Sequence, residues 1–480
     1  MVIALDVGTS SARAALYDAR GHAVEGRFHQ VPYEPTTTRD GGVEHDPRVL
    51  LDAATACLDT VARAARHDDV RAVGVTTFWH GLLGFDAHHK PVTPIFTWAD
   101  SRSAADAALL RGALDEAALH ARTGCHLHSS YWPAKLRWLA RDRPADVRRV
   151  VRWGSIGEYL ELTLFGEAET SVSMASGTGL FDQDALRWDT EALAAAGIEP
   201  AQLFPVRDLA QGRRGLRAPW ATRWPALRSV PWFPAVGDGA ASNVGSECTD
   251  PGRIALNVGT SAALRLVTAA ARTPPRGLWR YRIDRRRALL GGATSEGGNV
   301  YAWCRGILQL PDEAAVEREL AGRLPDDHGL TVLPFLAGER APGWRGDRRA
   351  AIAGLSLDTT AVDILHAALE AVALRLSLVY ELLAPLADAD HVIVASGGAI
   401  SRSPHWRRML ADALGRPIHS SAESEATGRG AALLALEAVG DIADATAVRG
   451  ALGEVVQPDA ARHARYRAAL ERHRRLDERV

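Results

Sequence analysis

Two short segments of the chain carry the residue types that bind phosphate groups. Residues 3–12 read Ile-Ala-Leu-Asp-Val-Gly-Thr-Ser-Ser-Ala and residues 254–263 read Ile-Ala-Leu-Asn-Val-Gly-Thr-Ser-Ala-Ala. In each copy the backbone amides and hydroxyls after the glycine can donate hydrogen bonds to phosphate oxygens. One such loop is as easily an ordinary turn, but a turn does not require the same side chains twice. The repetition therefore predicts two facing loops that hold a polyphosphate through Gly8, Thr9, Ser10, Gly259 and Thr260.

A carboxylate is present in the first copy only. Asp6 could hold Mg²⁺ through the waters of the ion, because Mg²⁺ loses its water reluctantly and binds one or two carboxylates. Arg13 follows the same loop and could face phosphate charge. The chain has no phosphate-binding P-loop, which needs Gly-Lys before Ser or Thr, because Lys90 and Lys135 lie in His-Lys-Pro and Ala-Lys-Leu. If the protein uses ATP, the paired loops must hold it.

A second carboxylate follows a short apolar segment. Residues 231–234 precede Val-Gly-Asp-Gly-Ala, so a strand is expected to end at Asp238 between two glycines. In phosphoryl transfer, a carboxylate at such a place can accept the proton of the attacking hydroxyl. Asp-Gly is also a common turn pair, and from these residues alone a turn is the favoured interpretation.

Aromatic and charged residues follow two further apolar runs. Trp79 and His80 come after residues 72–75, and Trp98, Asp100 and Arg102 come after residues 92–96. Aromatic faces pack on the C–H surface of a sugar while polar groups bind its hydroxyls, so these residues are candidates for substrate binding. A lone Trp or His is more often part of a core, and Asp100 and Arg102 could simply pair with each other.

A glycine turn near the C-terminus is a candidate nucleotide contact. Residues 392–396 form a β-branched apolar run typical of a buried parallel strand, and a helix is expected from about Pro404. Gly397, Gly398 and Ala399 lie between them. Backbone without large side chains lets a flat ring or a phosphate approach closely.

The elements that must position these residues are repeated as well. Each phosphate loop joins two apolar runs, which predicts a strand, a tight turn and a strand. A chain of 480 residues exceeds the size of one ordinary core, so we expect two domains of the same fold, residues 1–242 and 243–480. Apolar periodicity predicts structural helices at 362–383 and 427–439, and residues 460–480 resemble an exposed amphipathic helix.

Composition limits the partners. Hydrophobic residues make up 47% of the chain and charged residues 24%, as in ordinary globular proteins, and the net charge of -2 gives no field for a nucleic acid or a membrane surface. The four cysteines are too scattered for a zinc or redox pair. No apolar run is long enough to span a bilayer, and the first residues lack a leader pattern. We expect a cytoplasmic protein with a small-molecule partner, without nucleic acid or membrane; a homodimer is left open.

These motifs together resemble the FGGY family of carbohydrate kinases, relatives of actin and of the Hsp70 ATPase domain. The resemblance covers almost the whole chain, through the segments 6–13, 42–47, 79–81, 98–102, 237–239, 257–261, 336–342, 396–399 and 428–432. It implies an α/β fold with two duplicated ribonuclease-H-like lobes around a central cleft.

The resemblance also implies an activity. Members of the family use ATP and Mg²⁺ to phosphorylate a hydroxyl of a sugar, polyol or sugar acid. It assigns the role of general base to Asp238, the acceptor pocket to the clusters at Trp79–His80 and Trp98–Arg102, and adenosine contact to residues 396–399. Some relatives carry asparagine where Ser401-Arg402-Ser403 stand here, so the nucleotide base preference stays open.

Two segments bear on the substrate. Residues 173–179 and 336–344 look closest to gluconate kinases, and Trp79-His80-Gly81 resembles the Met-His-Gly of xylulose kinases. A gluconate carboxylate would need a cation, for which the sequence offers Arg102, His126, His128 or Lys135. The contrasting class is an actin-like ATPase that is not a kinase, which would share the two phosphate loops but not the acceptor clusters.

Overall fold

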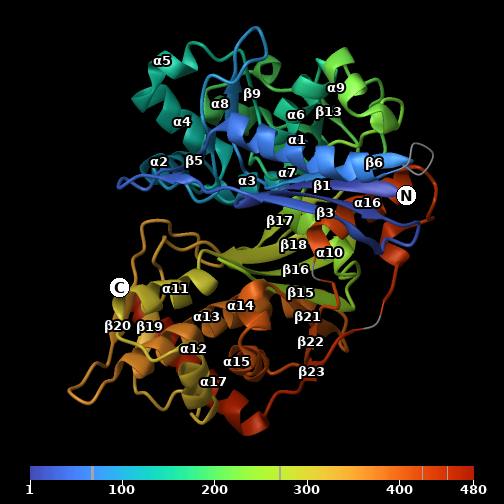
Figure 1. Cartoon of the computed structure of the whole chain (residues 1–480). Helices are drawn as coiled ribbons and strands as arrows, with labels where there is room; N and C mark the ends of the chain where they lie inside the picture. Colours follow the sequence, from blue (N-terminus) through green and yellow to red (C-terminus); the bar gives the residue numbers. More distant parts are fainter. Residues whose placement is uncertain (66–69, 270–271, 424, 451) are drawn as a thin grey trace.

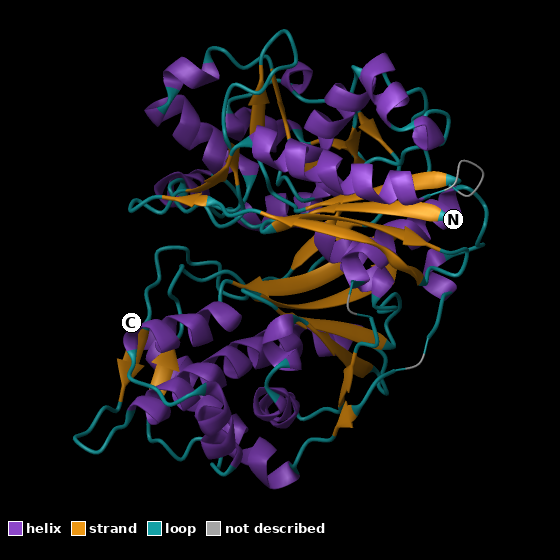
Figure 2. Ribbon diagram, viewed as in Figure 1, coloured by secondary structure: helices purple, strands orange, loops and turns teal. Residues whose placement is uncertain are grey.

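The computed structural model describes residues 1–65, 70–269, 272–423, 425–450 and 452–480. Two lobes, each built on a central sheet, lie one above the other (Figure 1). Helices cover the outer faces of both sheets (Figure 2). The predicted two-lobe α/β fold is confirmed.

The N-terminal sheet has the strand order β14-β6-β1-β2-β3. Strands β1 (Val2–Val7), β2 (Ser11–Tyr17) and β3 (Ala23–Pro32) are antiparallel, whereas β6 (Ala72–Thr77) and β14 (Val236–Gly237) run parallel to β1. Every residue of β1 is buried, because α1 (Pro47–Ala64) and α16 (Ala426–Ala438) both pack against it. A strand covered on both faces is continuously apolar rather than alternating, which explains the apolar run before the first phosphate loop.

The C-terminal sheet repeats this arrangement. Strands β15 (Arg253–Val258), β16 (Ala262–Ala269) and β18 (Arg287–Thr294) are antiparallel, and β21 (Val392–Ser396) and β22 (Ile418–Ser420) run parallel to β15. Strands β17 (Trp279–Arg282) and β23 (Val455–Val456) extend the two edges. Three antiparallel strands followed by two parallel ones thus occur in both lobes, and the repeated sequence lies on the first hairpin of each.

Three long helices support the C-terminal lobe. These are α13 (Ala361–Leu383), α15 (Pro404–Leu414) and α17 (Ala460–Arg479). The expected amphipathic helix is present as α17, which is largely exposed and buries Tyr466, Leu470 and His473 on one face. A few large side chains are enough to anchor this polar helix to the lobe.

The remaining elements surround these cores. In the N-terminal half they include α2 (Ala104–Ala113), α3 (Glu116–Thr123), α4 (Trp132–Asp142), α6 (Ile156–Phe165), α7 (Val172–Ser176) and α8 (Thr190–Ala196). In the C-terminal half they include α11 (Gly298–Ile307), α12 (Glu313–Ala321), β19 (Thr331–Leu333), β20 (Ala351–Ala353) and α14 (Gly398–Ser401). Among the described residues, no helix is both long and apolar enough to cross a bilayer.

The two lobes are joined by packing as well as by the chain. Helix α10 (Asp238–Gly245) lies against α16 so closely that a Cβ at Gly245 would be 1.8 Å from the Ala426 carbonyl oxygen. Strand β17 docks on the N-terminal lobe, where the Arg280 amide donates to the Gly124 carbonyl at 2.9 Å. The predicted domain boundary after residue 242 falls inside α10, the helix that begins with Asp238.

Candidate active site

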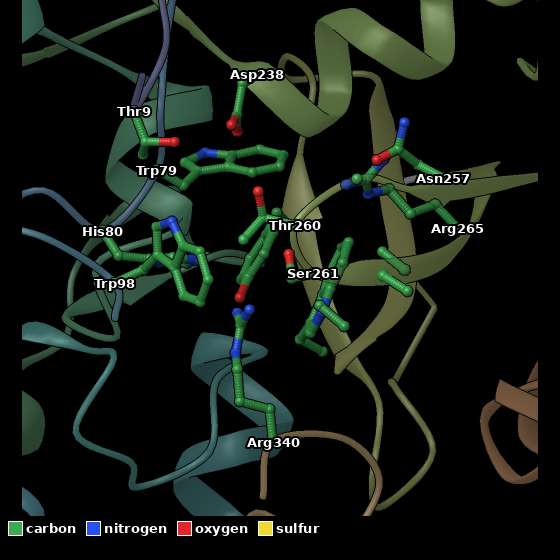
Figure 3. A pocket seen from close by; sticks show the side chains of 16 residues that line it. Thr9, Trp79, His80, Trp98, Asp238, Asn257, Thr260, Ser261, Arg265 and Arg340 are labelled. Carbon is green, nitrogen blue, oxygen red and sulfur yellow. The ribbon is translucent and has the colours of Figure 1, made fainter. Parts of the chain in front are cut away.

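A cavity of about 220 Å³ opens between the lobes, and its walls come from both (Figure 3). The N-terminal half contributes Thr9, Trp79, His80, Trp98 and Asp238. The C-terminal half contributes Asn257, Gly259, Thr260, Ser261, Ala262, Ala263, Arg265, Trp279, Tyr281, Ala293 and Arg340. We call this cavity the acceptor pocket, after the role that the sequence predicts for Trp79, His80 and Trp98.

The two phosphate hairpins face this pocket. Thr9 and Thr260 both line it, and each hairpin is closed by its glycine amide, Gly8 donating to Ser11 at 3.0 Å and Gly259 to Ser261 at 2.9 Å. Neither glycine has a left-handed backbone, so conformational freedom does not explain them. A Cβ at either position would meet no protein atom closer than 3.4 Å. The glycines therefore leave open space beside the hairpins, where a ligand can approach the backbone.

Asp238 lies where a strand ends and a helix begins. Strand β14 ends at Gly237 and α10 begins at Asp238, which is partly exposed to the acceptor pocket. Burial raises the pKa of this carboxyl, while Arg265 and the Gly239 amide, which donates to it at 2.8 Å, oppose the rise. A carboxylate with a raised pKa is a stronger proton acceptor than an exposed one.

Asp6 lies on β1, deeper in the same region. Burial raises its pKa to about 7; Arg13 opposes this, and the charge of Asp238 adds to it. The Arg13 Nη1 lies 3.5 Å from one carboxylate oxygen, and the other oxygen is buried without a hydrogen-bond partner in the structure. A buried carboxylate with an unpartnered oxygen beside a second carboxylate fits a divalent cation, which would neutralise both charges.

Trp79 forms a wall of the acceptor pocket and is fixed from behind. Its Nε1 donates to the Ser173 carbonyl at 3.0 Å, and its ring centroid lies 4.7 Å from that of Tyr281. The ring rests on two glycines: a Cβ at Gly237 would lie 1.9 Å from Trp79, and one at Gly239 would lie 2.8 Å from it. The glycines that flank Asp238 are therefore required by the aromatic wall, not by a turn.

His80 presents one ring nitrogen to the pocket. Its Nδ1 lies 2.6 Å from the Gly177 carbonyl oxygen, which can only accept, so Nδ1 carries the proton. Burial lowers the pKa of His80 well below its usual value, so the ring is neutral. Nε2 is then an acceptor for a ligand hydroxyl. The backbone of His80 has a left-handed φ of 69°, an uncommon conformation for a non-glycine residue that often marks a functional site.

The third predicted cluster is only partly at the pocket. Trp98 lines it, but Asp100 and Arg102 do not. Arg102 pairs with Asp100 and donates to Glu44 at 2.8 Å, and its guanidinium lies 4.6 Å from the ring centroid of Trp138. The structure thus does not place Asp100 and Arg102 for direct substrate contact, because their charges satisfy each other within the N-terminal lobe.

The other cations considered for a substrate carboxylate also lie outside the acceptor pocket. Lys135 is buried and donates to the carbonyls of Ser129 and Ser130, each at 2.6 Å. His126 stacks on Trp344. His128 faces a neighbouring space of about 340 Å³ that shares Thr9, Trp98, Thr260 and Arg340 with the acceptor pocket. None of the three lines the acceptor pocket itself.

Sequence reasoning missed two arginines and two aromatic residues of this pocket. Arg265 interrupts the apolar run of β16, and Arg340 lies in the segment 336–342 that carried the family resemblance. A charged residue within a buried strand was the available signal for Arg265. Trp279 and Tyr281 lie on β17, where they could not be told from core residues; only its docking on the N-terminal lobe brings them to the pocket.

A second cavity, of about 560 Å³, adjoins the acceptor pocket. It is lined by Arg13, Asn257, Gly397 and Gly398 among others, and Asn257 also lines the acceptor pocket. Gly397 has a left-handed φ of 107°, and a Cβ there would lie 2.3 Å from the Val258 carbonyl oxygen, so only glycine fits. Ala399 does not line this cavity.

Comparisons with known proteins agree with this architecture. Residues 1–245 match the model of the N-terminal domain of the FGGY family of carbohydrate kinases, and residues 254–439 match that of its C-terminal domain. A gluconokinase from Bacillus subtilis is 29% identical over 473 residues, covering 94% of this chain and 90% of the relative. A glycerol kinase from Polaromonas naphthalenivorans is 32% identical, covering 90% of each chain.

Two solved structures from Lactobacillus acidophilus are similar over nearly the full length. A gluconate kinase superposes with a TM-score of 0.90 at 26% identity, and a ligand-bound xylulose kinase with 0.91 at 25% identity. Each comparison covers 99% of this chain and 97% of the other. With both family models matched in order and the duplicated fold in place, this chain belongs to the FGGY family of carbohydrate kinases and is a phosphotransferase.

Proposed function

We propose that this enzyme transfers the terminal phosphoryl group of ATP to a hydroxyl of a small sugar acid, most simply gluconate, with Asp238 as the general base. One observation carries the proposal: the Asp238 carboxylate faces a pocket that the two phosphate hairpins also line, through Thr9 and Thr260. Phosphoryl transfer needs an acceptor oxygen, a proton acceptor and phosphate donors within one small space.

The nucleotide would lie across both cavities. The 560 Å³ cavity is open enough for adenosine beside Gly397 and Gly398, and Asn257 marks its junction with the acceptor pocket. The phosphates would extend past Asn257 and Arg13 toward the hairpins. Asp6 is the residue suited to hold Mg²⁺, which supplies charge neutralisation for the phosphates when bound.

The acceptor would be held by the aromatic walls and oriented by His80. The ring of Trp79 offers an apolar face, and His80 Nε2 accepts a hydrogen bond from a hydroxyl. Asp238 then accepts the proton of the attacking hydroxyl as its oxygen bonds to phosphorus. Burial raises the pKa of this carboxyl, and Arg265 opposes the rise, which favours the ionised form that accepts the proton.

Relatives leave three acceptor classes to compare. Gluconokinases support a sugar acid, xylulose kinases a ketose, and glycerol kinases a short polyol. Gluconate is favoured because the pocket is cationic, and xylulose is the runner-up. A non-kinase actin-like ATPase is disfavoured by a pocket with sugar-binding side chains beside the base.

A cytoplasmic location, and the absence of nucleic-acid and membrane partners, stay predictions.

The test is ADP production with ATP and Mg²⁺ across a panel of sugars, polyols and sugar acids, with the product identified. We expect at least one acceptor to raise turnover far above the rate with water. Asp238→Asn should then lower kcat by about 10²–10⁴-fold, the usual contribution of a general base, with nucleotide affinity changed little. Asp358→Asn, at an exposed position, is the matched control. An Asp238→Asn enzyme of normal rate, or no active acceptor, contradicts the proposal.

A further inference from the structure

We propose that the acceptor pocket is built for an anion, and that Arg265 and Arg340 bind the carboxylate of the acceptor. This inference rests on the proposed kinase function, and it assigns substrate recognition to two residues outside the predicted acceptor clusters. It replaces the cations considered from the sequence, none of which lines the acceptor pocket.

Arg265 enters the pocket from the centre of the C-terminal sheet. It lies on β16 between Ala255 of β15 and Gly291 of β18, and its guanidinium passes beneath α10, where a Cβ at Gly239 would be 3.1 Å from its Nε. Burial lowers its pKa, and Asp238 opposes this. Within the described residues, no hydrogen bond or ion pair to Arg265 is formed. A half-buried guanidinium without a partner raises the free energy of the folded protein. Such a group is expected where a ligand supplies the partner.

Arg340 reaches the pocket from the segment after β19. Its guanidinium carbon lies 5.1 Å from the ring centroid of Trp98 and 6.0 Å from that of Trp344. Its Nε is buried without a hydrogen-bond partner, and no described carboxylate pairs with it. The neighbouring Glu339 cannot serve, because it pairs with Arg375 and, at 2.7 Å, with Arg345. Those pairs fix the backbone and leave the Arg340 side chain aimed at the cavity.

The placement of the three charges suits an extended acid. Figure 3 shows Asp238 and Arg340 on opposite sides of the pocket, with the rings of Trp79 and Trp98 between them and Arg265 entering from the β16 side. Arg265 and Arg340 line the same pocket, and the charge of Arg340 adds to the lowering of the Arg265 pKa, so both cations act on one space. A hydroxyl at one end of an acid can then lie at Asp238 while its carboxylate lies at the guanidinium groups.

Charge balance favours an acid over a neutral sugar. The pocket holds two guanidinium groups against one carboxylate, that of Asp238. A carboxylate binds a guanidinium through two parallel hydrogen bonds, stronger than those to neutral groups. A neutral sugar would cover the same cations without neutralising them, which leaves buried charge unpaired. The competing explanation is that the arginines serve the transferred phosphoryl group, and this would affect every acceptor equally.

The experiment compares gluconate with glucitol, the six-carbon polyol that carries CH₂OH in place of the carboxylate. We expect the wild-type enzyme to prefer gluconate in kcat/KM. Because Arg265 also lowers the pKa of Asp238, Arg265→Gln should slow both reactions, so the ratio of the two kcat/KM values is the quantity to measure. We expect this ratio to fall about 100-fold or more in Arg265→Gln and in Arg340→Gln, because the lost partner leaves a buried carboxylate unpaired.

Two further variants separate charge from structure. Arg265→Lys keeps the charge and should recover part of the ratio, and Arg276→Gln, at an exposed position, should leave it unchanged. For each poorly active variant, gluconate binding is measured without nucleotide, with the tryptophan fluorescence of the pocket rings as the signal. This shows whether the variant still binds the acid. An equal loss for both acceptors, or unchanged gluconate binding in both arginine variants, overturns the inference. A wild-type enzyme that phosphorylates only neutral sugars also overturns it while the kinase function stands; no phosphorylated acceptor at all defeats the kinase proposal itself.

Discussion

Asp6 and Asp238 are two carboxylates that the fold buries in one cleft, and their environments differ. Asp238 has an arginine and a backbone amide to hold its charge. Asp6 has a weaker contact with Arg13 at 3.5 Å and one oxygen without a partner. Without a bound cation, ionisation of Asp6 therefore destabilises the fold.

Replacing Asp6 by Asn tests this at the residue scale. The folded-state pKa of about 7 is above the ordinary value of 3.8 for an aspartate, so the folded protein holds this proton more tightly than the unfolded chain does. Its contribution is complete below about pH 4 and is lost as the pH rises through 7. In Mg²⁺-free buffer, urea unfolding should show that Asp6→Asn gains stability relative to wild type between pH 5 and pH 8, on the order of 2 kcal/mol.

The same variant should behave oppositely with ligand. Mg²⁺ and nucleotide should stabilise the wild type more than Asp6→Asn at pH 8, because the variant lacks the charge that holds the ion. Asp358→Asn serves as the exposed control. Identical pH dependence of the wild type and Asp6→Asn would show that Asp6 does not titrate in the folded state.

At the scale of elements, the junction between β14 and α10 sets the position of Asp238, the proposed base. Three packing contacts fix it: the two glycines beneath Trp79, the close approach of α10 to α16, and the bond from Trp79 to the Ser173 carbonyl. The base and the aromatic wall are therefore positioned by the same short segment, and a change in one must move the other.

Gly237→Ala should expose this coupling. The new Cβ would lie 1.9 Å from the indole of Trp79, so the ring must move, at a cost of about 1–3 kcal/mol in the free energy of unfolding. Because Trp79 is a pocket wall, we expect KM for the acceptor to rise at least about 10-fold, with nucleotide affinity preserved. Gly112→Ala on α2 has open space around it and should be neutral or slightly stabilising. An unchanged acceptor KM in Gly237→Ala would contradict this role for Trp79.

At the scale of the whole molecule, the site exists only where two lobes meet. Thr9 belongs to one lobe and Thr260 to the other, and both line the same pocket, as the proposed binding of one polyphosphate requires. Contacts across the boundary already exist, since the hydroxyls of Tyr131 and Tyr281 lie 2.6 Å apart. If the lobes move, we expect them to turn about such contacts in the manner of a hinge.

Ligand binding should draw the lobes together. Closure excludes water, which protects the phosphoryl group during transfer. Small-angle scattering should show a smaller radius of gyration with the acceptor and a nonreactive ATP analogue together than with either alone. Asp238→Asn should close to the same extent, because it removes the base and not the phosphate contacts. No compaction in either protein would contradict lobe closure on ligand binding.

The sequence alone determined the duplication, the hairpins and the position of Asp238. The reason is physical. A strand, a glycine turn and a second strand are formed by neighbouring residues, so the sequence pattern that predicts them is local. In this chain that pattern occurs twice. The two-lobe fold followed from that repeat, and the family resemblance added the activity.

Only the tertiary structure decided which charges reach the pocket. Asp100 and Arg102 had the right chemistry but satisfy each other, whereas Arg265 and Arg340 come from a strand centre and a distant loop. Which side of a strand faces a cleft depends on register, and which cation lacks a partner depends on every residue packed around it. Both are set by contacts between residues far apart in the chain, and no local pattern records them.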